Sequence, residues 1–233
     1  MELGIEGAIP RFSFLLSLFM KLGFRPSDGH VLDLGCNLGT LAIAISQFQP
    51  RSIAASYVGL DVDPEALSRA KTLVPGADFV RCDARKLPFA SSTFNRAFAI
   101  SILEHINPEE LWTVLDELFS AMNHKGVLAV QIPNPYFPIE LHSKIPLLFY
   151  LPYRVRRRIY REVHGHDMGF YKLSQKELIR TCSRVFRLGA SCGYWYPPPL
   201  LRFPKTLHKA MSALGIFRLI PMGYVLTLES HKH

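Results

Sequence analysis

The stretch Val31-Leu-Asp-Leu-Gly-Cys-Asn-Leu-Gly-Thr40 decides the fold of this chain. An apolar run ends beside an acidic residue, a glycine-rich turn follows, and a helix is expected over about 41–49. Gly35 and Gly39 are spaced as Asp-x-Gly-x-x-x-Gly, and glycine tolerates positive φ and lets a ligand approach the backbone. The helix would then point its N-terminal amides at that ligand. This pattern is typical of a nucleotide-like cofactor site, although a tight strand–helix connection without a ligand would need the same glycines.

Two more apolar segments end in an acidic residue. Asp61 follows Tyr57-Val-Gly-Leu60, and Asp83 lies at the end of Ala77-Asp-Phe-Val-Arg-Cys-Asp-Ala84. An acid about 20 residues beyond a glycine-rich turn suits hydrogen bonding to ribose hydroxyls, and here the gap is somewhat longer. Asp83 is placed to meet an adenine amino group. Because the carboxyl ends of parallel strands share one edge, these acids predict a single ligand crevice.

Apolar strand patterns alternate with helical patterns along the chain, which predicts a parallel sheet with helices on both faces. Asn107-Pro-Glu-Glu110 is a helix start, and Ser174-Gln-Lys-Glu177 is a capping box before a helix at about 174–184. The strands are expected near 31–34, 57–60, 78–81, 96–100 and 127–132, with final β segments at about 187–195 and 223–229 and a helix near 205–214 between them.

Five segments in this order resemble the motifs of class I S-adenosylmethionine-dependent methyltransferases, and the match is closest to the small-molecule "type 11" group. The resemblance is tight over residues 28–134 and loose elsewhere. It implies a Rossmann-like, seven-stranded, mostly parallel sheet in the order 3-2-1-4-5-7-6 with the last strand antiparallel. It also implies S-adenosylmethionine as the cofactor. The segments are residues 31–40, 59–64, 82–89, 94–106 and 126–134.

The resemblance also implies which residues surround the cofactor. In resembling proteins an N-terminal basic residue sometimes meets the cofactor's carboxylate, a role that Arg11 would fill here, although a surface arginine is an equally open interpretation. The other implied positions are Asp33, Gly35, Asn37, Gly39, Asp61, Val62, Asp83, Ala84 and Ser101.

One domain over residues 1–233 fits the chain length, with an N-terminal helical segment at 1–27. Residues 133–172 break the strand–helix alternation and are long for a connection. In the resembling fold the segment after strand five commonly covers the substrate site. We therefore expect a helical lid there, over the methyl acceptor.

Methyl transfer from a sulfonium is an in-line displacement in which the enzyme mainly aligns the reactants. A hydroxyl acceptor also benefits from a general base, usually histidine. The candidates, in order of preference, are His142, His166 and His105. Each of them alone is as readily explained as a structural or surface histidine.

No metal site is expected, since the pair His164 and His166 has no cysteine partner nearby. The four cysteines lie far apart without a C-x-x-C pair, which indicates neither zinc nor a disulfide framework. A reducing cytoplasm fits best. The segment 12–24 is apolar but too short and too interrupted to cross a membrane.

The net charge is +8, and five arginines lie within the eight residues 154–161. Such a cluster suggests a phosphate-bearing partner or an anionic surface, and a solvated helix face is the alternative. Together with the neighbouring apolar run 145–153, the cluster favours a small or lipid-linked amphipathic acceptor. Oxygen is the preferred acceptor atom and carbon the second choice. The cluster also favours peripheral contact with an anionic membrane. The sequence does not indicate an oligomeric state.

Three other functions are alternatives. An RNA methyltransferase would use the basic cluster on phosphates, but no RNA-binding module is visible, so nucleic acid is not the expected partner. A non-catalytic cofactor-binding protein would keep the same motifs. A nicotinamide-dependent oxidoreductase would need Gly-x-Gly-x-x-Gly, and position 37 is Asn. Pro133-Asn-Pro-Tyr136 follows the fifth strand, whereas the similar motif of adenine methyltransferases follows the fourth.

Overall fold

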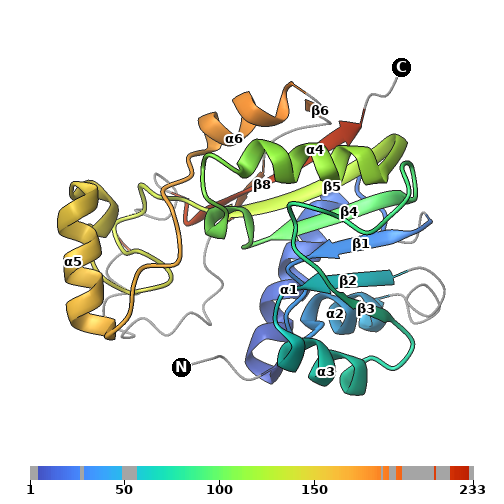
Figure 1. The fold of residues 1–233 in the computed structure, drawn as a ribbon, viewed down its shortest axis with the longest axis horizontal. Coiled ribbons are helices and arrows are strands. Elements are labelled where there is room, and N and C mark those ends of the chain that lie inside the picture. The colour runs from blue at the N-terminus through green and yellow to red at the C-terminus, as the bar shows by residue number, and fades with distance from the viewer. Residues whose placement is uncertain are drawn as a thin grey trace.

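A computed structural model describes residues 5–26, 29–48, 57–184, 186–188, 193–195, 213 and 221–230. They form one sheet with helices on both faces (Figure 1). The strands are β1 (Val31–Leu34), β2 (Tyr57–Asp61), β3 (Asp78–Arg81), β4 (Phe94–Ile100), β5 (Met122–Pro133), β6 (Phe186–Leu188), β7 (Gly193–Trp195) and β8 (Gly223–Ser230). The helices are α1 (Ile5–Lys21), α2 (Thr40–Phe48), α3 (Pro64–Leu73), α4 (Leu111–Ala121), α5 (Tyr153–His164) and α6 (Gln175–Cys182), with short 3₁₀ helices η1 (Leu103–His105) and η2 (Leu148–Tyr150).

The sheet order is β3-β2-β1-β4-β5-β8-β6, and β7 also pairs with β8. The first five strands are parallel, and β8 runs antiparallel to β5, β6 and β7. Leu188 pairs with Leu228 and Gly193 pairs with Val225, so β6 and β7 occupy two stretches of the same edge of β8. They correspond to the one segment expected at 187–195. The predicted order 3-2-1-4-5-7-6 with an antiparallel last strand is therefore confirmed.

Two apolar layers hold the helices to the sheet. On one face Leu15, Phe19 and Ile45 of α1 and α2 pack with Phe98 of β4, in a core that also includes α3. On the other face Leu115 of α4 belongs to a core that α6 completes. Alternate residues of β1 enter opposite cores, because successive side chains of a strand point to opposite faces.

Helix starts follow local chemistry with one exception. The Asp63 carboxylate caps α3 by accepting from the amides of Glu65 and Ala66, and Ser174 and Glu177 form the predicted capping box of α6. The expected start at Asn107 is displaced, since Asn107 Oδ1 accepts from the Glu109 amide in a preceding turn and α4 begins at Leu111. The helix expected near 205–214 lies outside the described residues, except for position 213.

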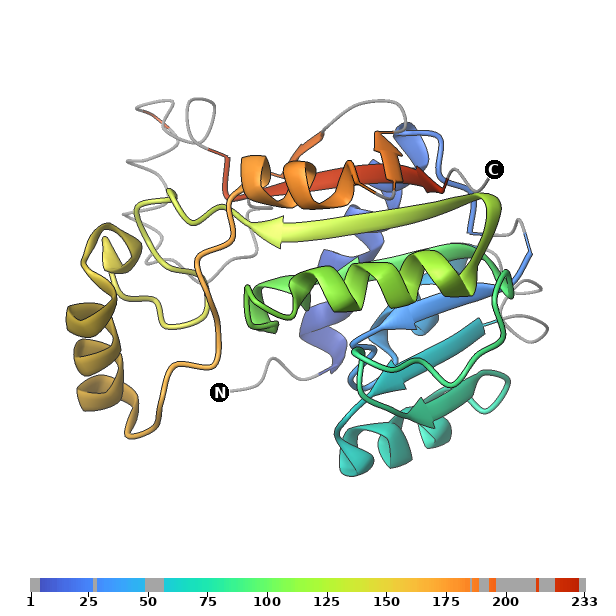
Figure 2. The same ribbon diagram turned by 45° about the horizontal axis from the view of Figure 1, so that its top comes forward.

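Residues 134–172 leave the sheet after β5 and carry η2 and α5. Both views place α5 beyond the carboxyl end of β5, apart from the sheet (Figures 1 and 2). A small core of its own, which includes Leu148, Phe149, Tyr160 and Phe170, holds this segment together. Among the helices in the described ranges, none combines the length and apolar character needed to cross a membrane.

Candidate cofactor and acceptor site

A crevice of about 330 Å³ opens at the carboxyl ends of β1, β2 and β3. It falls at the lower end of the size range of small-molecule sites. Its lining includes six of the predicted site residues, which are Gly35, Asp61, Val62, Asp83, Ala84 and His105. Val62 is 61% exposed, which leaves an apolar surface for a flat ring to pack against. A second hollow, beside β3, contains none of the predicted residues.

The turn between β1 and α2 has the backbone that its glycines predict. Gly35 and Gly39 have φ of +73° and +71°. A Cβ on Gly35 would lie 2.9 Å from the Ile102 side chain, so a larger residue would be both strained and crowded. The turn is anchored by the Gly35 amide, which donates to the Leu60 carbonyl over 2.8 Å.

Asp61 faces this turn from the end of β2. Its carboxylate accepts from the amide of Asn37 over 2.8 Å and from the amide of Asp63 over 3.1 Å. A carboxylate has about four acceptor positions, so both oxygens keep capacity for the hydroxyls of a ribose. Asp61 therefore contacts the glycine turn directly.

Asp83, after β3, is held by Arg85. The two side chains are joined by several hydrogen bonds of 2.5–3.1 Å, and Arg85 also pairs with Glu110 over 2.6 Å. The Arg85 hydrogen bonds lower the pKa of Asp83 to about 2. Arg85 therefore fixes an ionised acceptor at the far end of the crevice.

Arg11 comes from α1 but lies at the ends of β4 and β5. Its Nη2 donates to Ser101 Oγ over 2.5 Å and to Gln131 Oε1 over 3.1 Å, and Ser101 Oγ donates to the same Gln131 oxygen over 2.7 Å. Burial lowers the pKa of Arg11, and the nearby charge of Glu104 opposes that effect. Arg11 is thus half-buried, and its guanidinium is directed at the ends of β4 and β5.

Asp33 lies underneath the glycine turn and is only 3% exposed. The Tyr57 hydroxyl donates a short hydrogen bond to its carboxylate. Burial raises the pKa of Asp33 to about 7, and the hydrogen bond from Tyr57 partly opposes that rise. Asp33 is placed to support the turn from below.

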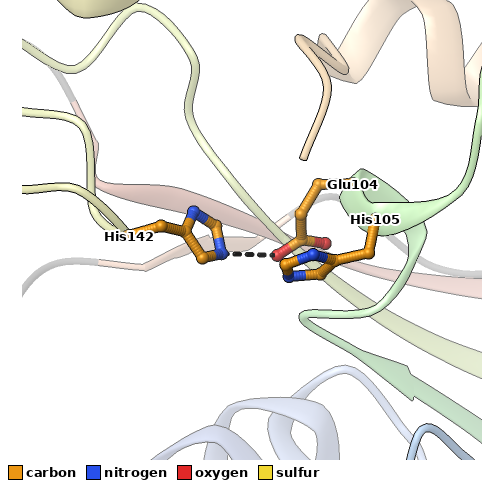
Figure 3. Close-up of side chains that lie close together, drawn as sticks. All are labelled: Glu104, His105 and His142. Atoms are coloured by element: carbon orange, nitrogen blue, oxygen red, sulfur yellow. Dashed lines mark ion pairs between the residues drawn. The ribbon is translucent and has the colours of Figure 1, made fainter. Parts of the chain in front are cut away.

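Two of the three predicted histidines come together beside the crevice. The rings of His105 and His142 are perpendicular, with centroids 5.0 Å apart. His105 Nδ1 lies 2.7 Å from the Gly169 carbonyl, and His142 Nδ1 lies 2.8 Å from Glu140 Oε1. His142 Nε2 faces Glu104 Oε1 at 3.6 Å (Figure 3).

The charges around His142 favour its protonated form. Burial by itself would lower the pKa of His142, but the carboxylates of Glu104 and Glu140 outweigh burial and raise it to about 9. Burial likewise opposes ionisation of Glu140, and the bond to His142 outweighs it and lowers the pKa of Glu140.

The third histidine, His166, lies elsewhere. Its ring is 5.4 Å from Tyr160, and Tyr160 in turn contacts Phe170, which stacks on His142 with centroids 4.6 Å apart. His166 is exposed and bonded to the backbone of Asp167. Two aromatic side chains therefore separate it from the crevice.

Sequence reasoning missed the side chains that hold these groups in place. Glu104, Gln131, Glu140, Tyr57 and Arg85 each contact a predicted residue. Glu104 gave a usable signal, because a charged residue directly after a buried apolar strand must find a partner. The sequence pattern around the other four residues gave no signal that would have identified them.

Comparison with known proteins agrees with this geometry. Residues 31–126 match the family described as a methyltransferase domain. An uncharacterised methyltransferase of Synechocystis sp. is 30% identical over 122 residues, which is 52% of this chain and 51% of that protein. Trans-aconitate 2-methyltransferase of Escherichia coli is 31% identical over 105 residues, 45% of this chain and 39% of that one. The chain thus spans about half the length, or less, of these curated relatives.

The fold extends beyond the matched segment. The crystal structure of an S-adenosylmethionine-dependent methyltransferase from Mesorhizobium loti superposes with a TM-score of 0.66 at 16% identity, covering 97% of this chain and 100% of the other. The fold is the Rossmann-like α/β fold with a crevice at the carboxyl edge of its parallel strands. Residues 31–126 therefore match a methyltransferase domain, and the fold around them is the one seen in S-adenosylmethionine-dependent methyltransferases.

Proposed function

We propose that the protein transfers a methyl group from S-adenosylmethionine to a small acceptor, oxygen first and carbon next. The observation that carries this proposal is the crevice itself, in which Gly35, Asp61 and Asp83 meet from three adjacent strand ends. Asp61 would bind the ribose hydroxyls. Asp83, Ala84 and Val62 would surround the adenine, and the turn with Gly39 and Asn37 would lie against the nucleoside.

The methionine part of the cofactor would extend toward β4 and β5. Arg11 and Ser101 lie there, and a guanidinium is the best matched partner for a carboxylate. This direction also leads from the crevice to His105 and His142. The methyl group would then be presented beside the Glu104–His105–His142 group, where we place the acceptor.

Among the three histidines, geometry favours His105 as the group that meets the acceptor. Both ring nitrogens of His142 face carboxylates, and His166 lies behind Phe170 and Tyr160. His105 uses Nδ1 on the Gly169 carbonyl, so its Nε2 carries the lone pair and is oriented by that bond.

We extend the proposal to an amphipathic or lipid-linked acceptor, which residues 134–172 would cover as a lid. The protein would lie in the cytoplasm and contact an anionic membrane at its surface. Large apolar side chains are exposed along this segment beside the arginines, at Leu147, Tyr150, Tyr153, Val155 and Val163. Trans-aconitate, which the Escherichia coli relative is named for, is itself a small anionic acceptor, so the anionic part of this proposal has a parallel.

Calorimetric titration with S-adenosylmethionine and, separately, with NAD tests the cofactor. We expect binding of the first and none of the second, and the reverse result would end the proposal. The non-catalytic alternative predicts cofactor binding without release of S-adenosylhomocysteine from any acceptor pool. The RNA alternative predicts RNA binding with a steep dependence on salt.

A further inference from the structure

The group Glu104, His105 and His142 has the composition of a metal site. One ligand atom from each side chain lies within 4.8 Å of the other two. The side chains come from two parts of the chain, His142 from one side and Glu104 with His105 from the other (Figure 3). Two imidazoles and one carboxylate form a set that binds divalent first-row transition metals.

The two histidines are already oriented as metal ligands usually are. A ligating histidine generally donates its second ring N–H to a carboxylate or a backbone carbonyl, which fixes the tautomer. Here the Nδ1 of His142 is hydrogen-bonded to the Glu140 carboxylate, and the Nδ1 of His105 is hydrogen-bonded to the Gly169 carbonyl. The Nε2 of His105 is thereby left for a ligand, and the Nε2 of His142 faces Glu104, the third member of the group.

Glu104 supplies an independent observation. Its side chain is 2% exposed, and neither carboxylate oxygen has a hydrogen-bond partner within the described part of the chain. The approach of His142 at 3.6 Å is longer than a hydrogen bond. A buried, unbonded carboxylate is costly, and a cation held between it and the imidazoles would satisfy it.

We propose that Glu104, His105 and His142 bind one divalent transition-metal ion at the rim of the cofactor crevice. Ligand bonds of about 2.1 Å would draw the ligand atoms closer together than the 4.8 Å within which they now lie, and Nε2 of His142 gives up its proton when the ion binds. From the sequence no metal site is expected, on the grounds of the pair His164 and His166 and the spacing of the cysteines, and this proposal departs from that expectation.

The ion also has a role, and that role rests on the proposed function. With three protein ligands it keeps open positions, and it lies next to the place proposed for the acceptor. With His105 Nε2 bound to it, the ion rather than the free imidazole would meet the acceptor. It would hold an acceptor oxygen and stabilise that oxygen as the anion, as a Lewis acid does, with any hydroxyl proton leaving to solvent. The acceptor would then carry a hydroxyl or carboxylate able to bind a metal.

Cobalt(II) tests the site directly, because its visible absorption reports nitrogen and carboxylate coordination. The untagged full chain is first treated with a chelator to remove bound metal, and the chelator is then removed. The metal-free protein is titrated with CoCl₂. We expect one ion per chain with a coordination spectrum, displaced by ZnCl₂. Glu104→Gln and His105→Gln should each weaken Co²⁺ binding by at least about 10-fold, and Glu140→Gln by about 10- to 100-fold through the orientation of His142.

His164→Gln is the matched control, because it disrupts the other histidine pair and should leave the Co²⁺ spectrum unchanged. If wild type gives no coordination spectrum, or if Glu104→Gln and His105→Gln keep full affinity, the site does not exist. If circular dichroism shows that Glu104→Gln does not fold, His105→Gln tests the site by itself, because His105 is exposed and its substitution should leave the fold intact. Titration with S-adenosylmethionine runs in parallel, so loss of the metal site and failure of the cofactor proposal are separate outcomes.

Discussion

Glu104 Oε1 and His142 Nε2 lie 3.6 Å apart, and this pair joins the end of the sheet to the segment that follows β5. Glu104 belongs to η1, directly after β4, whereas His142 belongs to residues 134–172. The contact is reinforced by Phe170, whose ring stacks on His142. The segment beyond β5 is therefore in direct contact with His105 and Glu104 at the edge of the crevice.

Asp61→Ala should weaken S-adenosylmethionine binding by about 1–3 kcal/mol, because ribose hydroxyls would lose their acceptor. This corresponds to roughly 5- to 150-fold in the dissociation constant, measured by calorimetry. Asp78→Ala is the control, since Asp78 begins β3 at the opposite edge of the sheet. An unchanged dissociation constant in folded Asp61→Ala would place the ribose elsewhere.

Arg11→Met should weaken binding of S-adenosylmethionine by about 1.5–3 kcal/mol, the range for hydrogen bonds to charged groups. Binding of methylthioadenosine, which lacks the methionine carboxylate, should change little. Comparing the two ligands by calorimetry separates loss of a carboxylate partner from general damage to the site. Arg25→Met, just beyond α1, controls for loss of a positive charge. Equal losses for both ligands would remove Arg11 from the cofactor site.

Asp33→Asn should change how stability depends on pH. The pKa of Asp33 is raised from 3.8 to about 7 in the folded protein, so between these values the folded state holds a proton that the unfolded state has released. The free energy of unfolding of the wild type therefore falls as pH rises through this window, by at most about 1.4 kcal/mol per pH unit.

The variant cannot titrate at position 33, so its unfolding free energy should decline less between pH 4 and pH 7. Urea unfolding at several pH values, without cofactor, measures the difference. Tyr57→Phe makes a second comparison, because losing the hydroxyl should raise the pKa of Asp33 further and extend the decline to higher pH. Parallel profiles for wild type and Asp33→Asn would mean that Asp33 ionises normally.

Anionic vesicles should bind the protein more strongly than neutral ones, and salt should weaken that binding, because exposed charges are screened over about 8–10 Å. Arg156→Gln, Arg157→Gln and Arg158→Gln together should remove most of it. Sedimentation measures the bound fraction.

Part of the arginine charge on α5 is already neutralised. Arg157 and Arg161 pair with Asp167 over 2.9 and 2.5 Å, and Arg158 pairs with Glu162. Asp167→Asn should therefore strengthen vesicle binding, which makes it the complement of the triple variant. Equal binding to neutral and anionic vesicles would mean that the arginine cluster is a solvated helix face without a role in membrane binding.

The sequence predicts what depends on neighbouring residues. The positive φ of Gly35 and Gly39 follows from their place between a strand and a helix, and the cap of α6 follows from Ser174 and Glu177. The strand order follows from alternation and resemblance. All of these signals lie within a few residues of the feature that they predict.

What could not be predicted depends on contacts distant in sequence. Glu104 meets His142 only because residues 134–172 fold back over the end of β4, and no periodic pattern encodes that return. The hold of Arg85 on both Asp83 and Glu110 is of the same kind.

The return of the chain from α5 is bonded to η1 on both sides of Phe170. The Tyr171 amide donates to the Glu104 carbonyl over 2.7 Å, and His105 Nδ1 donates to the Gly169 carbonyl. Displacing residues 169–171 would break both hydrogen bonds and leave the His105 ring without the bond that orients it. Under the proposed function, entry of an acceptor and exit of the methylated product past this segment would therefore be linked to the orientation of the His105 ring. By reciprocity, if a contact that holds α5 in place raises the affinity for the acceptor, the bound acceptor stabilises that contact by the same free energy.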